Sequence, residues 1–441
     1  MQTDINQDLI GQLVATFREK EANLNGQKDS VQHQLRRKGL EAFEKMEFPT
    51  TRNEEWKYTN IIPATSQAYS NYESKLADAD IDINQYLPEG LRTNVLVFVN
   101  GHYRKEASQL QYDGAYTIES IIDCQSEALG SVAKLDDQIF TAMNTASFEG
   151  GLHISIADHE VASQAIVILY LNDASQGSLI LNPRNLITAG KNSEATIIEF
   201  CCSINDTNPV LVNALMEVTV DESANLDIYK IQSEERKNTT HISRIVASQQ
   251  QKSNFSSNNF TFGGALVRND LDIELQGEHC ESYLNGLYLG SENQLIDNHS
   301  FVDHASPNCM SDEFYKGIMD DTSRAVFNGK IMVREDAQKT NAFQSNRNIL
   351  ASDTALVNTK PQLEIYADDV RCTHGATIGQ INQEAIFYMQ ARGISKESAK
   401  AILMLSFAGE VVDRLKFEDI KPYLQSQIAD KRRYEGELIL D

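Results

Sequence analysis

A tract of short apolar segments, running from about residue 150 to 370, constrains the fold most strongly. Apolar and polar residues alternate within each segment, and polar turns rich in Gly, Asn, Asp or Ser separate them. Alternation with a period of two predicts β-strands, and many short strands in succession predict one large β-domain. The segments are AIVILYL (165–171), ATIIEFCC (195–202), ALMEVTV (214–220), LDIYKI (226–231), HISRIVAS (241–248), LDIEL (271–275) and LEIYA (363–367).

A loose internal repeat runs through the later part of this tract. Turn-like residues, each followed by a short alternating segment, recur there at similar intervals, at Gly277, Gly290, Ser306, Asp321, Glu335 and Asp353. Such a repeat favours a solenoid, in which each rung is one unit stacked on its neighbours. At about 3.3 Å per residue, one repeat is long enough to wrap a flattened coil with a short strand on each side. Two packed sheets or a sandwich remain the alternative.

Helical patterns precede the β-tract. Apolar residues at helical spacing between Gln7 and Phe48 predict two helices, with a break at Asn25-Gly26 and an end at Pro49. The apolar run NVLVFV (94–99) then predicts a buried strand. We therefore expect an N-terminal helical region over 1–93.

Helical patterns also follow the β-tract. Asn382 can cap a short helix, and Ser395 can cap a second one that contains AKAILMLSFAGEVV (399–412). That second helix is apolar nearly all round, so it must be covered by the β-domain or by another protein. We expect a β-domain over 94–375, coiled from about 150, and a C-terminal helical domain over 376–441.

Charge excludes some classes of partner. Lys and Arg number 39 against 63 Asp and Glu, which gives a net charge of −24. A surface this acidic argues against binding nucleic acid or anionic membranes. No run of apolar residues is long enough to span a bilayer, and the first residues, MQTDINQDLI, lack the pattern of a signal peptide. We therefore expect a cytoplasmic protein whose six cysteines are thiols.

The motifs of common enzymes are missing from the sequence. It contains no G-x-x-x-x-G-K-[ST], no G-x-G-x-x-G after a strand, no C-x-x-C, no H-E-x-x-H and no G-x-S-x-G. We therefore expect no nucleotide site in this chain.

One short motif, Cys372-Thr373-His374, stands out after the last predicted strand. Residues two apart in an extended stretch point to the same face, and a thiolate with an imidazole can bind a soft or borderline metal. A neighbouring Arg371 favours the thiolate, whereas Asp368 and Asp369 oppose it. Two ligands do not complete a cluster site. From spacing alone, a buried cysteine beside a histidine with no metal is the more common case.

Other cysteines and histidines carry weaker signals. His299, His304 and Cys309 have spacings that suit a metal loop, but they fall in different rungs, so we expect them to point in different directions. Cys201 and Cys202 are adjacent in a strand, which places one inside the domain and one outside. Cys124, His153 and His159 have no partner visible in the sequence.

These residues together resemble the SufB/SufD family of the SUF iron–sulfur cluster assembly machinery. The resemblance is dense from 300 to 412, in FNGKIMV (327–333), AQKTNAFQSNRNILASDTALVNTKPQLEIYADDVRCTHGATIGQI (337–381) and FYMQARGI (387–394). VDHASPNCMSDEFYKGI (302–318) also fits. RNEEWKYTN (52–60), with its helical leader, is more similar to the SufD branch than to the SufB branch.

The resemblance implies a fold, partners and a site. The implied fold is mainly β: a right-handed parallel β-helix, or β-solenoid, flanked by N-terminal and C-terminal helical domains. The implied partners are a SufB-like paralogue and a SufC-like ABC ATPase, which docks on the C-terminal helices. The implied site is Cys372 and His374 in the C-x-H-G-A-T motif, holding an iron–sulfur cluster or iron transiently at the interface with the paralogue.

Several functions are compatible with these features. The leading one is a non-enzymatic subunit of the SUF scaffold complex. The others are a SufB-like paralogue that itself holds the cluster, a β-solenoid interaction module without cluster chemistry, and a polysaccharide-cleaving enzyme with paired carboxylates. No pair of carboxylates stands out in the sequence. The isolated chain can also form a homodimer if the end strands of two coils pair.

Overall fold

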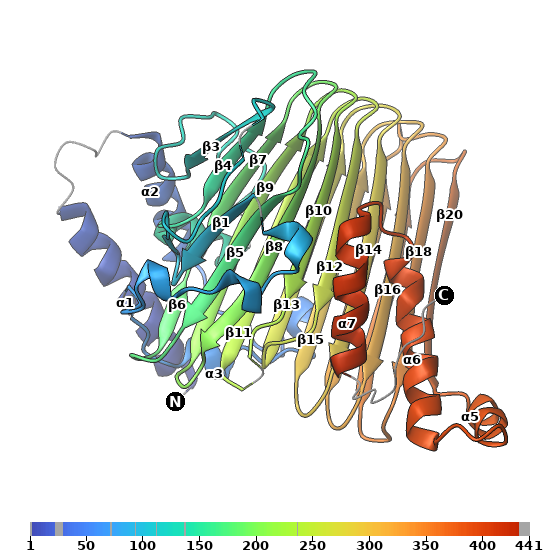
Figure 1. The fold of residues 1–441 in the computed structure, drawn as a ribbon. Coiled ribbons are helices and arrows are strands. Elements are labelled where there is room, and N and C mark those ends of the chain that lie inside the picture. Colours follow the sequence, from blue (N-terminus) through green and yellow to red (C-terminus); the bar gives the residue numbers. More distant parts are fainter. Residues whose placement is uncertain are drawn as a thin grey trace.

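A computed structural model describes residues 2–22, 30–70, 73–92, 94–111, 113–135, 138–235 and 237–431 (Figure 1). The chain is mainly β, with a parallel β-solenoid of about eight turns and helices at both ends. The predicted fold class is confirmed. No helix in these ranges is long and apolar enough to cross a membrane.

Two sheets form the walls of the coil. Sheet 1 contains, in spatial order, β2 (His102–Tyr103), β1 (Val95–Val99), β5 (Ile166–Asp173), β8 (Glu194–Asn205), β10 (Asn225–Gln232), β12 (Asn254–Thr261), β14 (Glu281–Gly290), β16 (Met310–Met319), β18 (Asn341–Leu350) and β20 (Arg371–Gln380). Sheet 2 contains β3 (Tyr116–Ser120), β4 (Leu152–Ile156), β7 (Arg184–Ala189), β9 (Val210–Val220), β11 (Thr239–Gln249), β13 (Leu266–Leu275), β15 (Leu295–His304), β17 (Arg324–Val333) and β19 (Leu356–Ile365). The short β6 (Leu179–Leu181) pairs with β9.

From β8 onward, successive strands alternate between the two sheets, and each pairs in parallel with the strand two places away. Glu281, Met310, Asn341 and Arg371 occupy equivalent positions, so each step from one of them to the next is one full turn of the coil. Each such step contains two of the repeats seen in the sequence. The sequence repeat therefore corresponds to half a turn of the coil and not to a whole turn. One ten-residue strand and one corner account for all the residues of a repeat.

The coil is filled by side chains that interlock between rungs. Aliphatic and aromatic residues such as Phe255 and Phe327 are fully buried there. Gly286 lies under the ring of Tyr315, and Gly317 lies against the ring of Tyr288, so a methyl group at either glycine would overlap an aromatic ring. Large and small residues thus alternate along the interior, as dense packing requires.

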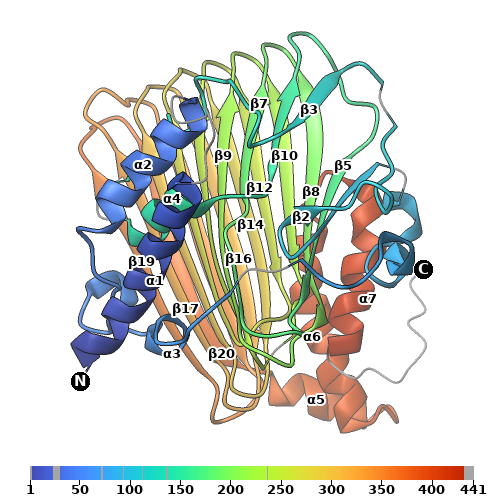
Figure 2. The ribbon, with the colours of Figure 1, turned by 90° about the vertical axis from the view of Figure 1, so that its left-hand side faces the viewer.

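The N-terminal helices cover the outer face of sheet 2 (Figure 2). They are α1 (Gln2–Ala22), α2 (Val31–Phe43), α3 (Ile62–Thr65) and α4 (Ile139–Ser147), with a 3-10 turn at Glu54–Trp56. Three further 3-10 turns, Asp78–Asp80, Ile83–Gln85 and Glu89–Leu91, lead into β1, and residues of the last two pack on the sheet 1 side. The predicted break at Asn25-Gly26 lies outside the described residues. The second helix ends at Phe43 and not at Pro49, because the chain turns back so that Phe48 packs on Phe43.

The C-terminal helices cover the outer face of sheet 1, on the opposite side of the coil (Figure 2). They are α5 (Gln383–Gln390), α6 (Lys396–Val412) and α7 (Lys421–Lys431), with a 3-10 turn at Glu418–Ile420. Asn382 and Ser395 cap α5 and α6 through their side chains, as predicted. The apolar face of α6 is buried against β14 and β16, so this chain itself supplies the cover that the helix needs.

Candidate functional site

The coil ends at β19 and β20, each the outermost strand of its sheet. Within the described ranges no strand pairs with their outer edges, so a row of backbone N–H and C=O groups is left for another chain. Every residue of β20 except Cys372 is exposed. Large apolar side chains are also exposed at this end, at Phe343, Leu356, Ile365, Tyr366 and Ile378.

Cys372 and His374 lie on this last strand and face the interior of the coil. In the parallel register Cys372 aligns with Ala342, and His374 aligns with Gln344. Ala342 is fully buried in the interior cluster, and Cys372 packs partly against that cluster. His374 is exposed at the mouth of the coil. The sequence prediction that both side chains share one face agrees with this register.

Burial, and not neighbouring charge, sets the pKa of the Cys372 thiol. It raises the pKa of Cys372 above the ordinary value, while the backbone N–H of Ala342 works weakly in the opposite direction. Arg371, Asp368 and Asp369, which the sequence suggested would influence the pKa of this thiol, do not contribute to the shift. The thiol is therefore protonated at neutral pH, and a metal that binds there must displace a proton.

A polar column lies behind His374. Gln344 Nε2 donates to Glu313 Oε2 over 2.7 Å, and both residues are buried. Burial raises the pKa of Glu313 to about 7, although hydrogen bonds from Ser300 and Gln344 partly oppose that shift. Glu313 can therefore exchange a proton near neutral pH, two rungs inside the candidate site.

The second cluster does not converge. His304 lies inside the coil, where its Nε2 is 2.9 Å from Ser311 Oγ, and Cys309 Sγ donates to the Gly277 carbonyl over 3.2 Å. His299 lies on the outer face of sheet 2, 2.9 Å from Asp297 and 3.3 Å from Glu55. His299 therefore faces away from the other two, and His304 and Cys309, although both lie inside the coil, have different partners, so the three do not form one site.

His299 instead helps to dock the RNEEWKYTN segment onto sheet 2. Thr59 Oγ1 donates to Asp297 Oδ2 over 2.6 Å, and Arg268 Nη1 donates to the same oxygen over 3.0 Å. The Arg268 guanidinium also stacks on Trp56, 3.9 Å from its ring centroid. This segment, residues 52–60, therefore fastens the N-terminal region to sheet 2, and we call it the clasp.

The two adjacent cysteines are both buried, although on opposite faces of β8. Cys201 belongs to the interior cluster, and Cys202 lies in the cluster between sheet 1 and the C-terminal helices. The prediction of one inward and one outward side chain agrees with this placement. The outward one is buried because helices cover that face.

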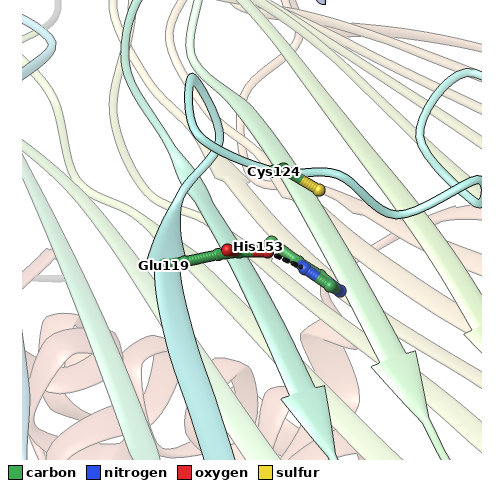
Figure 3. Close-up of side chains that lie close together, drawn as sticks. All are labelled: Glu119, Cys124 and His153. Atoms are coloured by element: carbon green, nitrogen blue, oxygen red, sulfur yellow. Dashed lines mark hydrogen bonds and ion pairs between the residues drawn. The ribbon is translucent and has the colours of Figure 1, made fainter. Parts of the chain in front are cut away.

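Sequence reasoning missed that Glu119, Cys124 and His153 converge. Their ligand atoms lie within 4.8 Å of one another near the start of the coil (Figure 3). Glu119 and His153 are distant in the sequence and meet only through the pairing of β3 with β4, so no local spacing could have revealed them. His159 is not part of this group.

Family comparisons cover almost the whole chain. Residues 170–407 match the model described as "SUF system FeS cluster assembly, SufBD core domain", and residues 7–168 match the "SufBD protein N-terminal region". The chain belongs to the SufB/SufD family. It acts in the assembly of iron–sulfur clusters by the SUF system.

Named relatives agree with this assignment. The iron–sulfur cluster assembly protein SufD of Escherichia coli is 28% identical over 387 residues, which are 87% of this chain and 89% of that protein. A SufBD family protein of Synechocystis is 28% identical over 93% of both chains. The chloroplastic protein ABCI7 of Arabidopsis thaliana is 31% identical over 56% of this chain and 52% of that protein. The likeness to SufD thus extends over most of the chain.

Proposed function

We propose that this chain is a SufD-type scaffold subunit, without catalysis of its own, that joins a SufB-like paralogue and a SufC-like ABC ATPase in the cytoplasm. The observation that carries the proposal is the open end of the coil. There an unpaired strand edge, exposed apolar residues and a thiol–imidazole pair occur together.

The strand edge suits a partner of similar construction. The outer edge of β20 can pair with an edge strand of a second coil through backbone hydrogen bonds. Apolar residues such as Ile378 and Tyr366 would then be buried in the joint. Such a joint would pair the backbone groups of an exposed strand edge, which otherwise favour aggregation.

The joint also explains why only two ligands are present. Cys372 and His374 cannot complete a cluster site alone, because such clusters usually take four protein ligands. The partner's edge would supply the rest. His374 is exposed and offers an imidazole nitrogen to iron, and Cys372 must lose its proton when it binds. Iron, or a nascent cluster, is therefore the cargo held transiently at this joint.

The ATPase would dock on the C-terminal helices through α5. Much of the apolar surface of α6 is already buried against sheet 1. On α5, however, Phe387 is 74% exposed and Tyr388 is 58% exposed. Paired aromatic residues on a projecting helix are a common anchor for a partner's pocket.

Substitution at the open end tests the site. We expect His374→Ala to melt within about 1–2 °C of the parent protein, since substitutions at exposed positions change stability by about 0.5 kcal/mol or less. Cys372→Ser, at a partly buried position, should lower the melting temperature only modestly. Both should fail to restore iron–sulfur enzyme activity in a strain that lacks this subunit, and His374→Ala should fail more severely. Thr373→Ala, on the opposite face of β20, is the matched control and should complement fully.

Other outcomes would reject this site. A large fall in melting temperature would mean that the two residues serve packing, and full complementation by both variants would mean that they serve no assembly role. Anaerobic reconstitution with iron and sulfide separates the alternatives. A cluster spectrum that needs the paralogue supports a shared site, a spectrum from this chain alone supports a SufB-like scaffold, and no spectrum in either case supports a plain interaction module.

The two interfaces are tested separately. Deleting residues 382–430 should abolish ATPase binding, and Phe387→Ala with Tyr388→Ala should weaken it strongly while leaving α6 in place. ATPase binding that survives both changes would contradict the assigned surface. Mass measurement of the purified chain should show a homodimer when the paralogue is absent and a heteromeric complex when it is present.

A further inference from the structure

We infer that Glu119, Cys124 and His153 form a binding site for a single divalent transition-metal ion of the borderline class, Zn²⁺ or Fe²⁺. This site lies at the opposite end of the coil from Cys372 and His374. β3 and β4 stand at the start of sheet 2, whereas β20 is the last strand of sheet 1.

The backbone holds the three ligands in one place. Glu119 and His153 are directly opposite each other in the antiparallel pairing of β3 with β4, so their side chains share a face. After β3 the chain turns sharply, with the Asp123 N–H donating to the Ser120 carbonyl over 2.9 Å. This turn brings Cys124 back over the pair (Figure 3).

A helix anchors the cysteine from the other side. The Gln32 side chain in α2 donates to the Cys124 carbonyl oxygen. Cys124 is fully buried in a small apolar cluster with Ile121, Phe148 and Leu186. The ligand frame therefore comes from two paired strands, a turn and a helix.

The histidine is oriented as metal-bound histidines usually are. His153 Nδ1 faces the Glu119 carboxylate at 2.7 Å, and Nε2 faces Thr188 Oγ1 on β7 at 3.2 Å. A ligating imidazole almost always donates its other N–H to a fixed acceptor, which sets the tautomer. Thr188 is thus a positioning residue, and an ion bound at Nδ1 would replace the hydrogen that Nδ1 and the Glu119 carboxylate share.

Ligand type and charge select the ion. Thiolate, imidazole and carboxylate together match Zn²⁺ and Fe²⁺ and disfavour Mg²⁺ or Ca²⁺. A thiolate and a carboxylate also neutralise a divalent ion, so the loaded site carries no net charge where it is buried. Without an ion the two anions repel. Burial raises the pKa of Cys124, and Glu119 adds to the effect, although a backbone hydrogen bond from Ser126 opposes it.

An entry path is present, and one coordination position stays open. The Glu119 side chain is 45% exposed, whereas the other two ligands are nearly covered. Three protein ligands around a tetrahedral ion leave a fourth position for water or an incoming group. The ion is therefore exchangeable, unlike one in a closed four-ligand structural site.

Cobalt is the probe for the test, because Co²⁺ bound to thiolate gives an absorption band in the near ultraviolet. The full chain carrying both Cys372→Ser and His374→Ala is stripped of metal and titrated with Co²⁺ without oxygen. We expect one equivalent to bind with the thiolate band and to be displaced by Zn²⁺ and, less readily, by Fe²⁺. Adding Cys124→Ser should abolish the band, and Cys309→Ser is the matched control that should retain it.

Two further variants keep the test valid if Cys124→Ser misfolds. Glu119→Gln, at the exposed ligand, should lower Co²⁺ affinity with an unchanged circular-dichroism melt. Thr188→Val should lower affinity by about 10- to 100-fold, as loss of an orienting partner usually does. The inference is overturned if no Co²⁺ binds, if it binds without the thiolate band, or if Glu119→Gln and Thr188→Val bind it as tightly as the parent.

Discussion

The clasp that docks residues 52–60 on sheet 2 should weaken as the pH rises, and His299→Gln should remove that dependence. His299 lies between Asp297, which is buried, and Glu55, which comes from the clasp. Burial opposes a charge on the His299 ring, but Asp297 outweighs it with help from Glu55, and the pKa of His299 rises to about 9. Burial likewise opposes the charge on Asp297, but His299 and Arg268 lower its pKa below the ordinary value.

The sign and size of the effect follow from this pKa. A histidine whose pKa is higher in the folded protein stabilises it fully below the unfolded value of about 6.5, and the contribution is lost as the pH rises through about 9. A rise from 6.5 to about 9 corresponds to about 3 kcal/mol as an upper limit. Glu55 is 58% exposed, so solvent screens its share. We expect a loss of about 1–3 kcal/mol between pH 6.5 and 9.5.

The only tryptophan of the chain provides the assay. Trp56 lies within the clasp, against Arg268, so its fluorescence reports the release of this segment directly. Urea titrations followed at Trp56 emission should show a midpoint that falls steadily between pH 6.5 and 9.5 in the parent protein. In His299→Gln the midpoint should be lower at pH 6.5 and should change little with pH.

A matched histidine variant separates this effect from general alkaline destabilisation. His102→Gln, on β2 in the other sheet, should keep the slope of the parent protein. An equal slope in His299→Gln and the parent, or no slope in either, would refute the assigned origin of the stability.

Two other changes test the interior of the coil. Glu313→Gln should stabilise the protein by about 1–3 kcal/mol at pH 8 and by little at pH 5. Burial raises the pKa of this carboxyl from its ordinary value to about 7, so its cost to folding builds up over that interval and stays constant above it. Urea unfolding at the two pH values checks this, and equal effects at both would contradict it. Gly286→Ala should cost about 1–3 kcal/mol because the new methyl overlaps the Tyr315 ring, whereas Gly375→Ala, with open space around it, should change the melting temperature little; equal melts for the two variants would contradict the packing described.

Strand and helix order could be predicted from the sequence because it depends on local patterns. The alternating segments became strands of the coil, and the caps at Asn382 and Ser395 form as their types require. The motif Cys372-Thr373-His374 was also visible, since residues two apart share a face on any strand. Whether that strand ends the coil, with its edge free, depends on the count and pairing of all the rungs.

Polar strands were harder to predict. β12, with the sequence NFSSNNFT, has few of the apolar residues that mark a strand, and yet most of it is buried. Asn285 Nδ2 donates to Asn258 Oδ1 of the adjacent rung over 2.9 Å, so stacked rungs satisfy each other's polar groups. A local sequence pattern cannot indicate a hydrogen-bond partner that lies a full turn of the coil away.

By itself the sequence determined which segments extend, which coil into helices and which two residues share the last strand, because those choices rest on neighbours within a few positions. The tertiary structure decided everything that depends on register. It separated His299 from His304 and Cys309, joined His299 to Glu55 in the clasp, and brought Glu119, Cys124 and His153 together. Register is set by long-range pairing between strands and by burial of one face, and a slip by a single position would turn every such side chain away from its partner.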